Sequence, residues 1–214
     1  MDIDYKDVID CSGIKRVLDE RGMKVKFLAE KVGQIPTRMS QIMRNNTFPK
    51  TDLIARICSV YEVPASKIIS FKLDEDEKKK AWFDGREPPF LPPENPEGVV
   101  TYDPLWQLVS LYLGYINEKK GTEYTANDLF DKIEPYRRRN GLYTLDQTDA
   151  TKKSLMARGF PEDYKSDRKR HYEAKGLIPQ VRTKLRNDRP LNIRTVYDIC
   201  NFFGCSIDWV MSYK

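Results

Sequence analysis

The amino-acid sequence predicts an all-α protein. Three observations support this prediction. Apolar side chains recur at helical spacing, every three to four residues, in short segments along the chain. Glycine, proline and asparagine residues separate these segments where helices would begin or end. No stretch alternates apolar and polar residues over the length that a half-buried strand requires.

Five short helices are predicted in the first 73 residues. The first one carries Ile14, Val17 and Leu18 on one face. Gly22 and Gly33 follow the first two helices at positions where a C-terminal glycine is favoured. The predicted segments cover residues 14–21, 25–32 and 36–44, a helix that Thr51 caps, and a short helix after Pro64. This number of short helices indicates one compact helical domain.

A charged and proline-rich segment lies between two parts of the chain. Residues 74–80 are all charged, and five prolines follow between residues 84 and 98. Proline at this density opposes both helix and sheet, so we expect a semi-rigid linker over residues 74–98. The sequence therefore predicts an N-terminal domain at 1–73 and a C-terminal domain at 99–214.

The C-terminal part is predicted to be helical as well. The apolar segment TYDPLWQLVSLYLGYI begins at Thr101 and predicts a helix from about residue 104 to 117. Thr125 is placed to cap the next helix. Further helices are expected at 148–157, 162–175, 179–187, 192–203 and 206–211.

Composition argues against a membrane-embedded or secreted protein. The chain has 214 residues, 32% of them charged, and no apolar run approaches the ~20 residues that a membrane helix needs. The N-terminal sequence MDIDYKDVID lacks the basic and then apolar pattern of a signal peptide. We expect a cytoplasmic protein that does not contact a membrane.

Charge is unevenly distributed along the chain. The net charge of the whole protein is +5 at pH 7. Residues 81–135 have a net charge of −6, whereas residues 136–191 have a net charge of +8. A basic block of this size is typical of a surface that binds a polyanion, although a solvated helical face would have the same composition.

Cysteine and histidine usage argues against the common metal sites. The four cysteines form no C-x-x-C pair, and His171 is the one histidine. Cys58 and Cys200 each follow an isoleucine in an apolar helical pattern, which indicates reduced, buried thiols. No phosphate-binding loop, Ser-His-Asp set or metal triad is found in the sequence. The sequence therefore predicts no metal, no cofactor and no enzymatic activity.

The chain contains an internal repeat. The tetrapeptide GQIP at residue 33 recurs as GLIP at residue 176. The segment ICSVYEVPASKIIS at residue 57 matches ICNFFGCSIDWVMS at residue 199 at its apolar positions. The two copies are offset by 143 residues early and by 142 later, so one deletion separates them. A repeat of this kind indicates a duplicated supersecondary unit.

Residues 14–70 resemble the helix-turn-helix domain of Cro and phage repressors, the XRE-like family. The residues that carry the resemblance are Leu28-Ala29-x-x-x-Gly33, Met39, Ile42, Pro49 and the ICSVYEV helix. In such a domain Ala29 is small where the recognition helix crosses, and Gly33 allows the tight turn between two helices. The chain departs from the family at Gln34 and Ile35, where an apolar residue and then a serine are usual.

A second, divergent copy of the same domain is indicated in the C-terminal part. The segment YDPLWQLV is similar to the family's first helix, and GCSIDWVM is similar to its last helix. Because too many residues lie between them, we expect an insertion near residues 118–163. Arg182 stands where Met39 stands in the first copy, and Val181 is a candidate to fill the pocket. The predicted fold is a five-helix repressor-like domain joined to a larger helical domain with a divergent helix-turn-helix.

The resemblance implies two groups of DNA-binding residues. Thr37 and Gln41 match positions that read base edges, and Arg38 borders that face. Lys26 and Arg44 match positions that hold phosphates. The candidates are Lys26, Thr37, Arg38, Gln41, Arg44 and Asn45 in the first copy, and Gln180, Arg182, Lys184 and Arg186 in the second. For both copies an ordinary solvated face is the alternative, and for the second copy contact with phosphate or protein alone is another.

These features predict a sequence-specific double-stranded DNA-binding regulator, a repressor of phage or mobile-element type. The alternative is a helix-turn-helix protein whose C-terminal domain binds and inhibits a host protein or ribonucleoprotein, as in some phage anti-CRISPR proteins. The insertion and six tryptophan and tyrosine residues between residues 82 and 124 favour this alternative, although a core needs such residues too.

Two arrangements on DNA are open. Repressors of this family usually place two recognition helices on successive major grooves, roughly 34 Å apart, by dimerising. A single chain with two recognition segments, 36–44 and 179–187, would act as a pseudo-dimer on an asymmetric site if its linker spans on the order of 45 Å. The competing arrangement is a homodimer that uses only the first copy on a palindrome.

Overall fold

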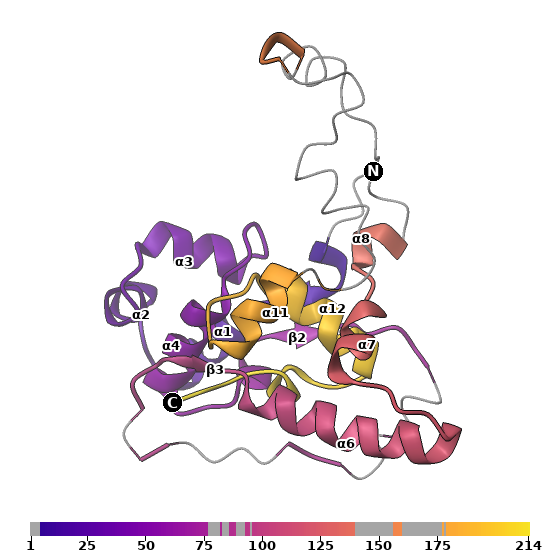
Figure 1. The fold of residues 1–214 in the computed structure, drawn as a ribbon. Helices are drawn as coiled ribbons and strands as arrows, with labels where there is room; N and C mark the ends of the chain where they lie inside the picture. The colour runs from indigo at the N-terminus through magenta and orange to yellow at the C-terminus, as the bar shows by residue number, and fades with distance from the viewer. Residues whose placement is uncertain are drawn as a thin grey trace.

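The structure is a computed structural model that describes residues 5–76, 82, 86–88, 93–94, 96–139, 156–159, 177 and 179–214. It is mostly helical, which confirms the coarse prediction of helical content. Two small antiparallel sheets of two strands each accompany the helices (Figure 1), and the sequence analysis did not predict them. Each strand has only two residues, too few to show an alternating pattern.

The first half of the chain, residues 5–73, is closed by its own sheet. Strand β1 pairs with strand β2 in antiparallel register, with Ile9 opposite Phe71. The predicted fifth helix is a single 3-10 turn, η2, although Ile68 and Ile69 after it are buried as expected. The elements are η1 Tyr5–Asp7, β1 Ile9–Asp10, α1 Gly13–Glu20, α2 Val25–Lys31, α3 Pro36–Met43, α4 Thr51–Tyr61, η2 Ala65–Lys67 and β2 Ser70–Phe71.

The described residues of the second half, within 99–214, repeat this order from the first strand onward, with α8 as an additional helix. Its first strand, β3, again pairs with its last strand, β4, with Val100 opposite Tyr213. The elements are β3 Val100–Thr101, α6 Asp103–Lys120, α7 Ala126–Asp131, α8 Tyr136–Arg139, α11 Pro179–Arg186, α12 Ile193–Phe203, η3 Ile207–Trp209 and β4 Ser212–Tyr213. The predicted helix at 162–175 and His171 lie outside the described residues, as does most of the predicted helix at 148–157.

Several buried positions of the two halves correspond. In α1 the buried residues Ile14, Val17 and Leu18 have the same spacing as Leu105, Leu108 and Val109 in α6. In α3 Ile42 is buried, and its counterpart in α11 is the buried Leu185. In both cases the apolar stripe follows the helical period and faces the core. The repeat in the sequence is therefore also a repeat in the structure.

Local signals at the helix ends are only partly confirmed. Thr125 caps α7 and forms a capping box with Asp128, whose pKa the hydrogen bonds from Thr125 lower. Gly22 and Gly33 have positive φ, as expected at the ends of α1 and α2. The prediction that Thr51 caps α4 was wrong, because the helix begins at Thr51 itself and its side chain turns into the protein.

The additional residues of the second half lie in two places. Helix α6 has 18 residues where α1 has 8. The larger addition lies between α7 and α11, at the turn that joins α2 to α3 in the first half. The Gln34 amide donates to the Ala29 carbonyl at 2.7 Å, and the equivalent Leu177 amide donates to the Phe130 carbonyl at 2.8 Å. Residues 134–175 thus have no counterpart in the first half, so the additional residues are divided between the end of α6 and this segment, whereas the sequence predicted one insertion near 118–163.

The two halves pack against each other about a local two-fold axis. The Thr51 amide donates to the Leu191 carbonyl at 2.9 Å, and the equivalent Ile193 amide donates to the Pro49 carbonyl at 3.4 Å. Lys50 and Asn192, which are equivalent residues, form an isolated antiparallel bridge between these hydrogen bonds. Reciprocal contacts between equivalent residues are typical of a symmetric dimer interface. Here the interface is formed within one chain.

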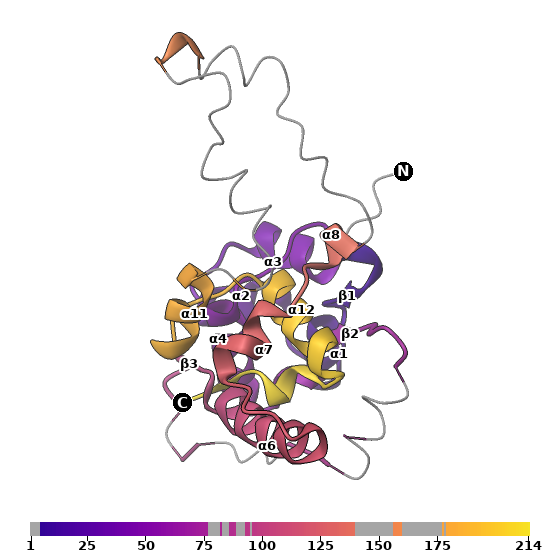
Figure 2. The same ribbon diagram turned by 45° about the vertical axis from the view of Figure 1, so that its right-hand side comes forward.

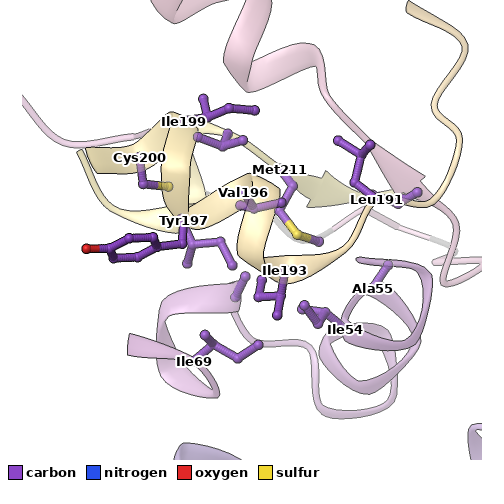
Figure 3. Packing of buried hydrophobic residues seen from close by; sticks show 14 of the residues in the cluster. Ile54, Ala55, Ile69, Leu191, Ile193, Val196, Tyr197, Ile199, Cys200 and Met211 are labelled. Carbon is purple, nitrogen blue, oxygen red and sulfur yellow. The ribbon is translucent and has the colours of Figure 1, made fainter. Parts of the chain in front are cut away.

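A shared apolar core fills this interface. Figure 3 shows Ile54 and Ala55 of α4 beside Ile193 and Val196 of α12, and all four side chains are buried. Buried residues of both halves belong to one cluster. The halves are therefore in direct contact, and an extended linker does not hold them apart. The domain boundaries at 1–73 and 99–214 stay a prediction.

Candidate nucleic-acid interface

Helix α3 exposes a polar face while its other face is fixed in the core. Met39 and Ile42 are fully buried, three residues apart, and hold the helix against the first half. Pro36 occupies the first turn, where its missing amide proton costs nothing. The side chains of Thr37, Arg38 and Gln41 consequently point to solvent and are exposed.

The exposed side chains of α3 have no partner within the described part of the chain. No hydrogen bond or ion pair among the described residues involves the side chains of Thr37, Arg38 or Gln41. Lys26 on α2 and Arg44, which follows the last residue of α3, are exposed as well. The structure therefore gathers five of the six first-copy candidates on α2, α3 and the residue after α3, and their polar groups are free to contact a ligand.

Asn45, the sixth candidate, has a role inside the protein. Its φ is +59°, a left-handed conformation that asparagine tolerates better than most residues. Its side-chain oxygen accepts a hydrogen bond from the Cys11 amide at 2.8 Å, and its side-chain nitrogen donates to Asp10 at 3.1 Å. Asn45 thus ties the end of α3 to the last residue of β1 and to the residue after it.

The second half makes the same tie with a different residue. Asp188 is the counterpart of Asn45 and also has a left-handed φ, +49°. Its carboxylate accepts a hydrogen bond from the Tyr102 amide at 3.0 Å, just as Asn45 accepts one from Cys11. Lys214 forms an ion pair with the same carboxylate at 2.8 Å. Sequence analysis missed this pair because the partners are far apart in the chain.

Helix α11 exposes a polar face that is equivalent to that of α3. Leu185 is fully buried and anchors the helix. Gln180, Lys184 and Arg186 are exposed. Neither α3 nor α11 contains an acidic residue, so each face is neutral or positive. In both views α3 lies on the side of the molecule opposite α6, and α11 lies at a height between them (Figures 1 and 2).

Arg182 is the one candidate of α11 that points into the protein. Its side chain is 17% exposed, and its Nε donates to the Leu177 carbonyl at 2.9 Å. Its guanidinium also forms an ion pair with Asp131 and a 3.5 Å hydrogen bond with Asn127, both on α7. Val181 is half-buried against the core, as predicted for the pocket-filling residue. An arginine at an otherwise apolar position of the repeat is a signal that an acidic partner lies nearby.

The aromatic residues between 82 and 124 serve mainly as core. Trp82 is buried against Tyr112, with their ring centroids 4.9 Å apart. Tyr102 is fully buried, and Trp106 packs on Phe130 at 5.8 Å. Tyr115, with 36% of its surface exposed, is the exposed large apolar residue among the six. This placement weakens the aromatic argument for a partner-binding surface.

Cys58 and Cys200 are buried free thiols, as predicted. All four cysteines are free thiols within the protein. Burial raises the pKa of the Cys11 thiol to about 12, so this thiol stays protonated and unreactive near neutral pH. Among the described residues, no group of histidine, cysteine or acidic side chains has the arrangement of a metal site.

Comparisons with protein-family models, curated proteins and solved structures find no significant match for this chain. In the described part of the chain, none of the helices combines the length and apolar character needed to cross a membrane. The function is therefore argued from the two exposed helix faces and their arrangement.

Proposed function

We propose that this protein is a sequence-specific double-stranded DNA-binding regulator that reads DNA with α3 and α11. The observation that carries the proposal is that two exposed, acid-free helix faces belong to two halves related by a local two-fold axis. Proteins that read DNA with a helix in the major groove commonly use two copies related by such an axis. Under this proposal α2 with α3, and α7 with α11, form the two helix-turn-helix units.

The exposed side chains fit the chemistry of base edges. Gln41 can make two hydrogen bonds to adenine, and Arg38 can make two to guanine. In the second unit Gln180 and Lys184 take the places of Thr37 and Gln41, so the preferred bases differ. Lys26, Arg44 and Arg186 are placed for phosphate contacts. Arg182 and Asn45 are excluded from this set, because their polar groups already bind other parts of the protein.

A single chain is the expected binding unit. The reciprocal hydrogen bonds around Lys50 and Asn192 fill, within one chain, the interface that a symmetric dimer would form between two chains. The two proposed recognition helices, α3 and α11, carry different side chains, so the preferred DNA site is asymmetric. Binding such a site in a promoter would repress transcription, and we propose this role, in the setting of a phage or mobile element.

Selection of binding sites from random DNA, with the full-length protein, tests the proposal. We expect a two-part, non-palindromic site with its halves about 10 base pairs apart from centre to centre. The mass of the complex should correspond to one chain for each duplex. Affinity should fall steeply with salt, because each neutralised phosphate releases counterions. A palindromic site bound by two chains would contradict the single-chain unit, and binding without sequence preference would contradict the whole proposal.

Inhibition of a host protein or ribonucleoprotein is the second candidate. It rests on residues 134–175, which the first half lacks. A double variant, Thr37→Ala with Gln41→Ala, separates the two functions. If the variant loses sequence preference but still captures one defined host complex, the second half has an inhibitory role of its own. If capture from lysate depends on DNA, the second candidate is contradicted.

A further inference from the structure

A chain of buried hydrogen bonds crosses the interface between the two halves. Thr51, the first residue of α4, and Tyr102, between β3 and α6, are both fully buried. Their hydroxyl oxygens are 2.8 Å apart. The Leu191 amide donates to the Thr51 hydroxyl at 2.9 Å, and the Tyr102 hydroxyl donates to the Arg189 carbonyl at 3.1 Å. Thr51 of the first half is thus bonded to two residues of the second, Tyr102 and Leu191, and through Tyr102 it is linked to Arg189.

The direction of each hydrogen bond in this buried series is fixed. Because the Tyr102 hydroxyl proton goes to the Arg189 carbonyl, the Thr51 hydroxyl must donate to the Tyr102 oxygen. The Thr51 oxygen then accepts from the Leu191 amide. Burial raises the pKa of the Tyr102 hydroxyl to about 12, so its proton is retained at neutral pH. Every polar group in the chain is satisfied, which makes the loss of any member costly.

The segment that these bonds hold is the connection from α11 to α12. Arg189 and Leu191 lie in it, and so does Asp188, which accepts the Tyr102 amide hydrogen bond. Asp188 lies two residues after the last residue of α11, Arg186. The position of α11 relative to the first half therefore depends on the Thr51 and Tyr102 hydroxyls.

The equivalent place on the other side of the axis has no such chain. The counterpart of Thr51 is Ile193, and the counterpart of Tyr102 is Cys11, so neither hydroxyl is present. Asn45 ties α3 to Cys11 within the first half only. The hydroxyl chain is thus a feature that the local two-fold symmetry does not require.

We propose that Thr51 and Tyr102 are positioning residues that fix α11 relative to α3 and so set the spacing between the two half-sites on DNA. The inference rests on the proposed function, because it concerns the distance between two DNA-reading helices. Thr51→Val keeps the shape of the side chain but leaves the Tyr102 oxygen and the Leu191 amide without their partner. Tyr102→Phe removes the other hydroxyl.

The test uses the selected site and a series of derived duplexes in which the spacer is shortened or lengthened by one to three base pairs. Wild-type protein should prefer one spacing. With either variant the affinity for that duplex should fall about tenfold, the effect expected of one buried hydrogen bond. The preference among spacings should flatten, and the affinity for an isolated first half-site should stay within about twofold, since α3 does not depend on these bonds. Amide hydrogen exchange at Leu191 should accelerate in Thr51→Val.

Tyr61→Phe is the matched control. Tyr61 is also fully buried, but its hydroxyl has no hydrogen-bond partner in the described structure, so its removal should leave the spacing profile unchanged. An equal loss on the full site and on the half-site, or an unchanged profile in both hydroxyl variants, would overturn the positioning role. A wild-type protein that shows no preferred two-part site would instead overturn the proposed function, and the spacing role with it.

Discussion

The two halves of the chain place an exposed helix in the same position but fix it by different chemistry. In the first half Met39 is fully buried beneath α3. In the second half the equivalent residue is Arg182, which turns back to Asp131 and to the Leu177 carbonyl. What the halves share is a buried residue one turn further on, Ile42 or Leu185. The shared anchor determines where the helix lies, and the second anchor can be apolar or ionic.

The turn before the helix shows the same principle. The first half closes it with Gly33, at φ +65°, and with a hydrogen bond from Gln34 to Ala29. The second half keeps the equivalent hydrogen bond from Leu177 to Phe130, although residues 134–175 intervene. The entropy of closing a loop grows only slowly with its length, so a long insertion is tolerated when both ends are fixed. Arg182 fixes both ends of the insertion, because it contacts α7, which precedes the insertion, and Leu177, which follows it.

The largest expected effect comes from removing the apolar anchor. Met39→Ala should lower the free energy of unfolding by about 2–5 kcal/mol, because it leaves a cavity in a fully packed site. Met43→Ala, at a half-buried position of the same helix, is the control and should cost less. Chemical denaturation followed by circular dichroism measures both. Since both halves share one core, a single transition should shift. Two separate transitions, of which only the first moves, would show that the halves unfold independently.

The next largest effect is expected on the base preference of α3 and α11. Gln41→Ala should weaken discrimination by about 1–3 kcal/mol at base pairs in one half of the selected site, and Lys184→Ala should do the same in the other half. Binding to a set of duplexes, each with one base pair changed, measures the effect. Lys26→Ala is the control, since loss of a phosphate contact should weaken all duplexes alike. If Gln41→Ala and Lys184→Ala affect the same base pairs, the two halves do not read separate half-sites.

Local sequence signals predicted most of the helices of this fold but neither its two-residue strands nor its long-range contacts. The helical periods around Ile14, Leu105 and Leu185 depend on spacing alone. Thr51 was predicted to cap α4 because threonine is a favoured N-cap residue. Its hydroxyl instead bonds to the Tyr102 hydroxyl, and these residues are 51 positions apart in the sequence, so no local pattern indicates the contact.

The candidate site shows the same limit. The exposed faces of α3 and α11 follow from the helical period. The internal roles of Asn45 and Arg182 depend on Cys11 and Asp131, which only the tertiary fold brings near. The sequence predicted one insertion near 118–163 instead of two additions, because the long apolar period of α6 and the short α7 gave no sign of where the first half's pattern resumes.

Replacing the ionic anchor of α11 by the apolar anchor of α3 should have a smaller effect on the free energy of unfolding. Arg182→Met places the first half's residue in the second half. Asp131 is 60% exposed and stays hydrated without its partner, so the free energy of unfolding should stay within about 1 kcal/mol of the wild type. Arg182→Ala should be less stable than Arg182→Met, because it also loses the packing of the side-chain stem. Arg186→Met, at an exposed position of the same helix, controls for the change in net charge. A large loss in Arg182→Met would show that the ion pair is required to hold α11.

The smallest effect on the free energy of unfolding is expected at a second point where equivalent residues of the two halves meet. The Ser66 amide donates to the Asp208 carboxylate at 3.0 Å, and these residues are 142 positions apart, as the repeat requires. Burial raises the pKa of the Asp208 carboxyl above its usual value, despite the hydrogen bonds from Ser66 that oppose the shift. Folding therefore disfavours the ionised carboxylate, and this group destabilises the protein increasingly as the pH rises above about 4.

Asp208→Asn removes the ionisation and keeps a side-chain oxygen that can accept the Ser66 hydrogen bond. Its free energy of unfolding relative to wild type should therefore rise as the pH increases above about 4, the usual pKa of the carboxyl, and level off once the wild-type carboxyl is fully ionised in both states. Asp19→Asn, at an exposed position on α1, is the control for the change in net charge. Denaturation curves at a series of pH values measure the difference between each variant and the wild type. A difference that is constant with pH would show that folding does not shift this pKa, and one that falls as the pH rises would show that the carboxylate is stabilised at this contact.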